Sequence, residues 1–210
     1  MSDARPDPQP QPDEAERHKA KMQAAQARHR ARQAETRDPE RGLVLVHTGN
    51  GKGKSSSAFG VIVRALGWRK SVGVVQFIKG SWITGERQFF DRLGGVDWHT
   101  MGEGFTWDTQ DRDRDIAAAT AAFDRARAMM SSGDYDLIVL DEINIALRYA
   151  YLSPAQVLAG LEARAARTGV ILTGRDAPAE LCEYADLVTE MTEVKHPYAA
   201  GIKAQRGVDF

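Results

Sequence analysis

A glycine-rich segment near residue 50 constrains the fold of this chain more than any other feature. Residues 48–55 read Thr-Gly-Asn-Gly-Lys-Gly-Lys-Ser, between an apolar run at 43–46 and a helix-compatible run at 56–66. A strand, a glycine-rich turn and a helix in this order form a phosphate-binding P-loop. The glycines let several backbone N–H groups point at one anion, beside the positive end of the helix. We therefore predict that this segment holds the phosphates of a nucleoside triphosphate.

Two side chains of the loop have the chemistry that such a site needs. Lys54 supplies a positive charge for the phosphates, and the Ser55 hydroxyl is a ligand for Mg²⁺. The pattern G-x-x-x-x-G-K-[ST] is broken at its first position, where Thr48 replaces glycine, so Gly49 and Gly51 are expected to provide the turn. The alternative, a glycine-rich surface loop, is disfavoured by the strand and helix patterns on either side.

The composition is that of an ordinary globular protein. The chain is 42% hydrophobic and 27% charged, and its formal net charge of -1 gives no general attraction to nucleic acid. The single cysteine, Cys182, excludes a disulfide framework or a cysteine metal cluster. No apolar run reaches the length of a membrane span, and the N-terminus lacks the apolar region of a secretory signal. We expect a cytoplasmic protein without nucleic-acid or membrane partners.

Three parts are expected along the chain. Residues 1–12 contain four prolines and are predicted to be a disordered tail. Residues 13–41 form a charged segment rich in helix formers, in which Met22 is the one large apolar side chain up to residue 37. Such a helix has almost no face to bury, so it is either a solvated tail or a lid that orders over an anionic ligand or a partner subunit. Residues 42–210 form the P-loop domain.

The P-loop domain alternates short apolar runs with helical stretches. The expected strands are residues 43–46, 72–77, 137–140, 170–173 and 187–191. The expected helices are residues 56–66, residues 112–131 with Gly133 as the stop, a helix that begins at Ser153-Pro154, and residues 178–184. This alternation indicates an α/β fold of the P-loop NTPase-like (RecA-like) kind, a mostly parallel sheet with helices on both faces. Residues 78–109 are rich in glycine and are interpreted as irregular.

A second nucleotide-site element is predicted where an apolar strand ends in two acids. Residues 137–140 read Leu-Ile-Val-Leu and are followed by Asp141 and Glu142, the pattern of a Walker B element. We expect one of these carboxylates to reach the Mg²⁺ beside the P-loop, and the pattern alone leaves open which one does so. In an ATP hydrolase the second acid commonly polarises water, so that role is open as well.

Other candidate residues are less tightly constrained by the pattern. Arg64 follows Lys54 by ten residues on the expected P-loop helix and either reaches the nucleotide or stays in solvent. Arg175 follows the strand at 170–173, where a ligand role, a helix-capping role or a surface role is equally compatible. Phe105 and Trp107 lie between glycines in an irregular segment, so they either pack on the core or offer an apolar wall to a large planar ligand.

In combination, the motifs resemble one known family. They are residues 48–55, 74–80, 85–87, 104–110, 140–142 and 194–207, in that order. This series resembles the P-loop ATP:corrinoid adenosyltransferases, which act on cob(I)alamin or cob(I)yrinic acid a,c-diamide, and the resemblance covers residues 42–210. It implies transfer of the 5′-deoxyadenosyl group of ATP to the cobalt of a reduced corrinoid, with release of triphosphate, in adenosylcobalamin biosynthesis or corrinoid salvage.

The resemblance also implies roles for individual residues. The implied ATP-binding residues are Gly49, Asn50, Gly51, Lys52, Gly53, Lys54, Ser55, Ser56 and Arg64. Ser55 and Glu142 are the implied ligands of Mg²⁺, for which Mn²⁺ is an alternative. Lys54, Phe105 and Trp107 are the implied catalytic residues, with the aromatic pair against the lower face of the corrin.

The same resemblance implies partners: a homodimer, and a reductase of the flavodoxin or flavoprotein kind that delivers the electron to cobalt. It also suggests that the segment 13–41 covers the corrinoid site. Two other functions fit the loop and the acids by themselves. One is a RecA-like or motor-type ATPase, and the other is a nucleotide-binding or corrinoid-carrying protein without turnover.

Overall fold

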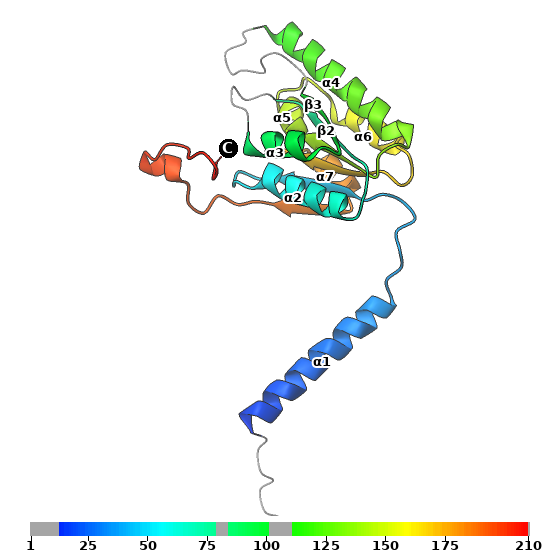
Figure 1. Cartoon of the computed structure of the whole chain (residues 1–210), viewed down its shortest axis with the longest axis vertical. Coiled ribbons are helices and arrows are strands. Elements are labelled where there is room, and N and C mark those ends of the chain that lie inside the picture. The colour runs from blue at the N-terminus through cyan, green and yellow to red at the C-terminus, as the bar shows by residue number, and fades with distance from the viewer. Residues whose placement is uncertain (1–12, 79–83, 101–110, 210) are drawn as a thin grey trace, which may run out of the picture. The chain divides into compact units, whose positions relative to one another are not determined.

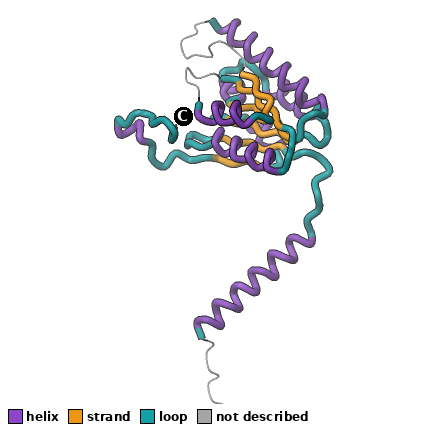
Figure 2. The backbone as a smooth tube through the Cα atoms, in the orientation of Figure 1, coloured by secondary structure: helices purple, strands orange, loops and turns teal. Residues whose placement is uncertain are grey.

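A six-stranded sheet forms the centre of residues 40–210 in the computed structural model, which describes residues 13–78, 84–100 and 111–209 (Figures 1 and 2). The strands are β1 (Val44–Thr48), β2 (Val72–Gln76), β3 (Val96–Thr100), β4 (Leu137–Asp141), β5 (Gly169–Thr173) and β6 (Leu187–Glu190). Their order across the sheet is β3-β2-β4-β5-β1-β6, and every neighbouring pair is parallel. The predicted parallel α/β fold of the P-loop NTPase kind is confirmed.

The register of the strands brings polar residues together at one edge of the sheet. Gln76 at the end of β2 pairs with Asp141 at the end of β4. On the other side, Leu140 pairs with Leu172, which places Asp141 beside Thr173 at the end of β5. Thr48 ends β1 at the same edge, because all strands run in one direction. The carboxyl ends of parallel strands are where ligands bind in such sheets.

Helices cover both faces of the sheet. On one face lie α2 (Lys54–Gly67) and α3 (Gly85–Leu93), and on the other lie α4 (Arg112–Ser132), α5 (Ile143–Arg148), α6 (Pro154–Glu162) and α7 (Ala179–Tyr184). Successive residues of the buried strand β4 point to opposite faces, so Leu137 and Val139 pack with Phe59 of α2, while Ile138 and Leu140 pack with the second group of helices. Two apolar cores result, one on each side of the sheet.

Local sequence signals set several helix ends as predicted. Ser153 and Gln156 form a reciprocal capping box at the start of α6, and Pro154 occupies its first turn. Gly133 ends α4 with a φ of 80°, a left-handed conformation that glycine adopts without strain.

The interpretation of residues 78–109 as irregular is wrong in two places. Helix α3 begins at Gly85, directly after its N-cap residue Thr84, whose hydroxyl accepts a hydrogen bond from the Arg87 N–H. Strand β3 pairs with β2 at the edge of the sheet. The strand Val-Asp-Trp-His-Thr is only partly buried along its whole length, so its sequence lacks the apolar run of a central strand. Short, half-exposed elements of this kind depend on their neighbours in the fold, which a local pattern does not reveal.

Residues 13–39 contain one helix, α1 (Glu14–Ala34), within the segment that the composition marks as helix-forming. No residue of α1 is buried, and Met22 is 48% exposed. The role of this segment as a lid stays a prediction. Among the described helices, none combines the length and the hydropathy that crossing a bilayer requires.

Candidate functional site

The P-loop connects β1 to α2, and its shape depends on glycine at two positions. Gly49 has a φ of 92° and Gly53 a φ of 112°, both in the left-handed region that L-residues with side chains rarely adopt. Space is equally restrictive at Gly49, because a Cβ there would lie 2.5 Å from the Met191 carbonyl oxygen. Gly49 therefore provides the turn as predicted, but its second left-handed residue is Gly53 and not Gly51, for which that prediction is wrong.

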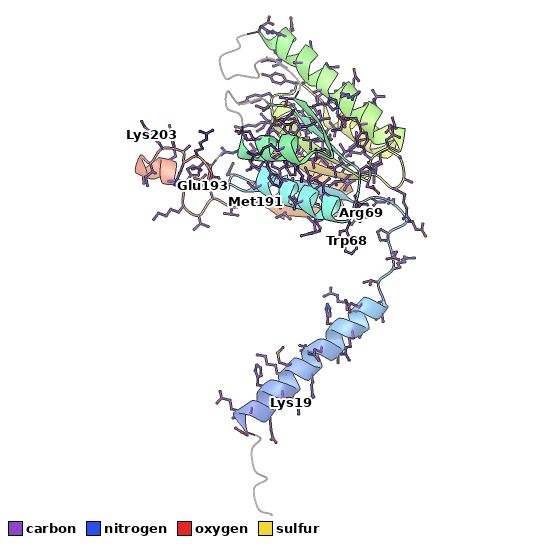
Figure 3. All side chains as sticks on the ribbon, in the orientation of Figure 1. Lys19, Trp68, Arg69, Met191, Glu193 and Lys203 are labelled. Carbon is purple, nitrogen blue, oxygen red and sulfur yellow. The ribbon has the colours of Figure 1, made fainter. Side chains whose placement is uncertain are left out.

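The chain that follows β6 fixes the loop from outside. The Gly51 N–H donates to the Met191 carbonyl over 2.6 Å, and the Met191 N–H donates to the Thr48 carbonyl over 2.9 Å. A Cβ at Gly51 would lie 2.8 Å from the Met191 oxygen. Figure 3 labels Met191 at the start of the C-terminal segment. The glycines therefore allow close packing of this segment as well as the turn itself.

The Lys54 ammonium lies inside the loop. The side chain is 7% exposed, and its Nζ donates to the carbonyl oxygens of Gly49 at 2.9 Å and Gly51 at 2.7 Å. Burial lowers the pKa of Lys54, and the nearby charge of Glu142 partly offsets this effect. The charge is held at the first turn of α2, where an arriving phosphate would compete with the loop carbonyls for the same donor.

A cleft of about 720 Å³ opens in front of the loop. This volume is within the usual range for small-molecule and cofactor sites. Its lining includes six consecutive residues from the P-loop and the start of α2, both Walker B acids, and residues from α3, α5 and the loop after β5. The described lining residues are Gly51, Lys52, Gly53, Lys54, Ser55, Ser56, Phe59, Gln76, Ile78, Thr84, Glu86, Asp141, Glu142, Ile145, Arg148, Arg175, Val208 and Asp209.

Asp141 is the more deeply buried of the two acids. It is 2% exposed, and its carboxylate accepts hydrogen bonds from the Thr173 hydroxyl at 2.8 Å and the Gln76 amide at 3.1 Å. Burial raises the pKa of Asp141, while hydrogen bonds from Ser55, Thr173 and Gln76 favour its charged form. Asp141 therefore ties three strand or helix ends together behind the cleft.

Glu142 stands one residue further on, in an unusual backbone conformation. Its φ is 62°, in the left-handed region, at the junction of β4 and α5. Burial and the charge of Asp141 raise its pKa to about 7, and the charges of Lys54 and Arg175 oppose that rise. Two neighbouring acids whose pKa values are both raised are a favourable place for a cation, which would stabilise their charged forms.

The oxygen donors of this corner suit Mg²⁺. Ser55, Asp141 and Glu142 supply a hydroxyl and two carboxylates along one wall of the cleft. Mg²⁺ prefers oxygen ligands and commonly takes one or two carboxylates together with the phosphates of a substrate. Within the described ranges, no group of three or more histidine, cysteine or acidic residues could hold a metal by itself. The donor set therefore fits a cation that arrives with a nucleotide.

Two arginines add positive charge to the cleft. Arg175, for which the sequence leaves a ligand role and other roles open, lines the cleft. Arg148, at the end of α5, lines it as well and forms an ion pair with Asp176 at 3.1 Å. Arg148 was not predicted from the sequence, because the six-residue helix α5 was not predicted either. The polar strand-end residues Gln76 and Thr173 were also missed, although a polar residue after a buried apolar run was the available signal.

Some of the predicted nucleotide residues lie elsewhere. Arg64 is exposed in the last turn of α2, about 15 Å along the helix axis from Lys54, and neither it nor Asn50 is among the described residues that line the cleft. Lys52 lines the cleft and forms an ion pair with Asp209 of the C-terminal segment. Phe105 and Trp107 lie outside the described residues. The binding roles of all these residues stay predictions.

Comparison with known proteins connects this geometry to one family. A family model described as ATP:corrinoid adenosyltransferase BtuR/CobO/CobP matches residues 40–210. The corrinoid adenosyltransferase of Pseudomonas aeruginosa is 56% identical over 157 residues, which cover 74% of this chain and 77% of that protein. The corrinoid adenosyltransferase CobA of Salmonella typhimurium is 43% identical over 156 residues, 74% of this chain and 79% of that protein.

Among solved structures, the KaiC-like protein PH0186 of Pyrococcus horikoshii covers 74% of this chain and 75% of its own, with a TM-score of 0.42 and 17% identity. The sequence relatives and the family model give the assignment. Since the model matches more than three quarters of the residues, P-loop and acids included, this chain belongs to the ATP:corrinoid adenosyltransferase family.

Proposed function

We propose that this protein transfers the 5′-deoxyadenosyl group of ATP to the cobalt of a reduced corrinoid. The observation that carries the proposal is the meeting of Lys54, Glu142 and Arg175 in one cleft of nucleotide size, in a chain that belongs to this family. The reaction makes one bond and breaks one. Cobalt(I) donates an electron pair to C5′ of ATP, and the C5′–oxygen bond breaks with its electron pair on the departing triphosphate.

The P-loop has an unusual task in this reaction, because the phosphates leave as one unit. The barrier falls when the charge that develops on the leaving oxygens is met by groups already in place. The Lys54 ammonium is held by the carbonyl oxygens of Gly49 and Gly51, at the loop that would receive the phosphates. Mg²⁺, when bound, supplies further positive charge to the triphosphate. No attacking water is required, which favours Glu142 as a metal ligand over a general base.

The assignment of the cation ligands follows from the same corner of the cleft. Ser55 and Glu142 are our proposed ligands of Mg²⁺, because both line the cleft next to Lys54. Asp141 is better suited to hold its neighbours, since three hydrogen-bonding side chains engage its carboxylate. The sequence alone left open which of the two adjacent acids binds the metal and which one holds its neighbours.

Several finer statements rest on the family resemblance and belong to the proposal. We infer a homodimer, a flavodoxin or flavoprotein as electron donor, and a lid function for the segment 13–41. The exposed surface and positive charge of α1 are compatible with a lid, because its polar side chains are free to meet a ligand with amide and phosphate groups. The wider context is adenosylcobalamin biosynthesis or corrinoid salvage.

Identification of the released polyphosphate tests the proposal directly. The protein is incubated with ATP and Mg²⁺, with and without chemically reduced cob(I)alamin. We expect triphosphate and an adenosylated corrinoid in equal amounts, and only when the reduced corrinoid is present. Orthophosphate released from ATP without corrinoid would identify an ATPase. Binding of ATP or corrinoid without any product would identify a carrier.

The aromatic pair at residues 105 and 107 gives a second test. Cobalt(I) forms readily only after the lower axial ligand of the corrinoid has left, and an apolar wall disfavours that ligand and water. We expect Phe105→Ala or Trp107→Ala to slow cobalt reduction and to reduce the four-coordinate Co(II) form. The absorbance spectrum of Co(II) corrinoid bound to the protein with ATP measures this. A spectrum unchanged from that of the unmodified protein would exclude the aromatic wall.

A further inference from the structure

A buried threonine connects the two Walker B acids. Thr173 ends β5 and is 0% exposed. Its hydroxyl oxygen accepts a hydrogen bond from the Glu142 backbone N–H at 2.9 Å, and its hydroxyl proton is donated to Asp141 Oδ1 at 2.8 Å. One hydroxyl therefore contacts the side chain of the first acid and the backbone of the second.

The direction of these two bonds is determined by chemistry. A backbone N–H can only donate, so the Thr173 oxygen must accept from Glu142. The hydroxyl has one proton, which is left for the carboxylate of Asp141. The arrangement therefore holds Asp141 as an acceptor and Glu142 by its main chain, and a side chain without a hydroxyl cannot reproduce either contact.

The backbone that Thr173 holds is a strained one. Glu142 adopts a φ of 62°, which costs a residue with a side chain energy unless its surroundings maintain it. The residue that directly follows β5 leaves space for the Glu142 side chain. Gly174 has a φ of 127°, and a Cβ there would lie 3.3 Å from Glu142 Oε2 and 2.9 Å from Asn144 Cβ. The end of β5 thus both fixes the Glu142 backbone and leaves space for its carboxylate.

We propose that Thr173 is a positioning residue for the cation site, acting through Glu142 and Asp141 rather than by touching the substrate. The inference rests on the proposed function, in which Glu142 binds the Mg²⁺ that accompanies ATP. Groups that orient metal ligands typically change metal affinity about 10–100-fold when they are removed. Loss of this hydroxyl should therefore weaken the binding of the cation more than the binding of the nucleotide or the corrinoid.

The matched pair of variants is Thr173→Val and Thr168→Val. Each removes one buried hydroxyl from a threonine at an end of β5, and Thr168 donates to the Tyr135 carbonyl at 2.8 Å on the side of the sheet away from the cleft. Thr173→Ser keeps the hydroxyl, and Thr173→Cys offers only a weak donor in a similar volume. Thermal unfolding of each variant reports whether it is folded.

The measurement is the affinity for Mn²⁺ in the presence of ATP and the absence of corrinoid. The decrease of the electron paramagnetic resonance signal of free Mn²⁺ reports how much of it is bound. We expect Thr173→Val to weaken Mn²⁺ binding about 10–100-fold. Thr168→Val and Thr173→Ser should bind as the unmodified protein does. If Thr173→Val does not fold, Thr173→Cys takes its place, with a smaller loss expected. The Mg²⁺ concentration for half-maximal adenosyl transfer should rise by the same factor.

The outcomes separate this inference from the function on which it rests. If the unmodified protein forms adenosylcorrinoid, but Thr173→Val binds Mn²⁺ as tightly as it does, Thr173 is not a positioning residue. An equal loss in Thr168→Val would also overturn the inference, because the effect would then be general to β5. If the unmodified protein makes no adenosylcorrinoid at all, the proposed function fails instead, and the Mn²⁺ comparison still decides the role of Thr173.

Discussion

Replacement of Lys54 by alanine is expected to lower the rate of adenosyl transfer on the order of 1,000-fold while the protein stays folded. Removal of one preorganised group that stabilises developing charge typically costs about 100–1,000-fold, and the Lys54 ammonium is held at the P-loop with only 7% of the residue exposed. Its Nζ lies among the carbonyls of Gly49 and Gly51, so a neutral side chain leaves the loop without a cation for the departing triphosphate.

Stability should change little in this variant, because two effects oppose each other. The loop carbonyls lose a hydrogen-bond donor, but the cost of keeping a buried ammonium is removed as well, a cost that the lowered pKa of Lys54 reflects. Lys70→Ala is the matched control. Its Nζ forms an exposed ion pair with Asp136, before β4, at the opposite edge of the sheet. Triphosphate formation and the unfolding temperature are measured for both. A normal rate in Lys54→Ala would show that the loop does not act on the triphosphate.

Much of the fold could be predicted because its decisive signals are local. The P-loop motif lies between a strand and a helix, and the buried strand β4 is a continuous apolar run, so each was visible within a dozen residues. The elements that were missed lack such signals. Strand β3 is half-buried at the sheet edge, and helix α5 has only six residues, which is too short to show a helical period.

The candidate site was predictable in its parts but not in its connections. Lys54, Ser55 and the pair of acids could be named from spacing alone. The contact between Gly51 and Met191 joins segments 140 residues apart, and the bridge from Thr173 to Asp141 depends on the register of β4 and β5. The different environments of Asp141 and Glu142 have the same origin. No local pattern reports how two strands pair, so these roles required the fold.

Replacement of Glu142 by glutamine is expected to lower adenosyl transfer on the order of 100-fold and, at the same time, to stabilise the metal-free protein at pH 8. The loss of activity follows from removal of a charged ligand for Mg²⁺. The gain in stability follows from the raised pKa of Glu142, about 7 in the folded protein against 4.5 for an ordinary glutamate. Such a carboxylate is held in its charged form at a cost.

The pH range of this effect follows from proton binding. Between pH 4.5 and 7 the folded protein holds the Glu142 proton more tightly than the unfolded chain does, so the free energy of unfolding falls as the pH rises through this window. Above pH 7 this decrease in the free energy of unfolding is complete, and it amounts to at most about 3 kcal/mol because the group remains partly accessible. Glutamine is neutral throughout. Its advantage should therefore be present at pH 8 and absent at pH 4.5.

Urea unfolding at pH 5 and pH 8, without metal or nucleotide, measures this advantage. Glu162→Gln, at the exposed end of α6, serves as the control for the substitution itself. An equal effect of Glu142→Gln at both pH values would contradict the raised pKa. Addition of Mg²⁺ and ATP should reverse the order of stability at pH 8, because the unmodified protein keeps the Glu142 carboxylate as a metal ligand and so binds Mg²⁺ with ATP in its folded state more tightly. Two acids side by side at the end of a buried strand lower the free energy of unfolding of the metal-free protein, and the same two acids provide the negative charge that binds a cation.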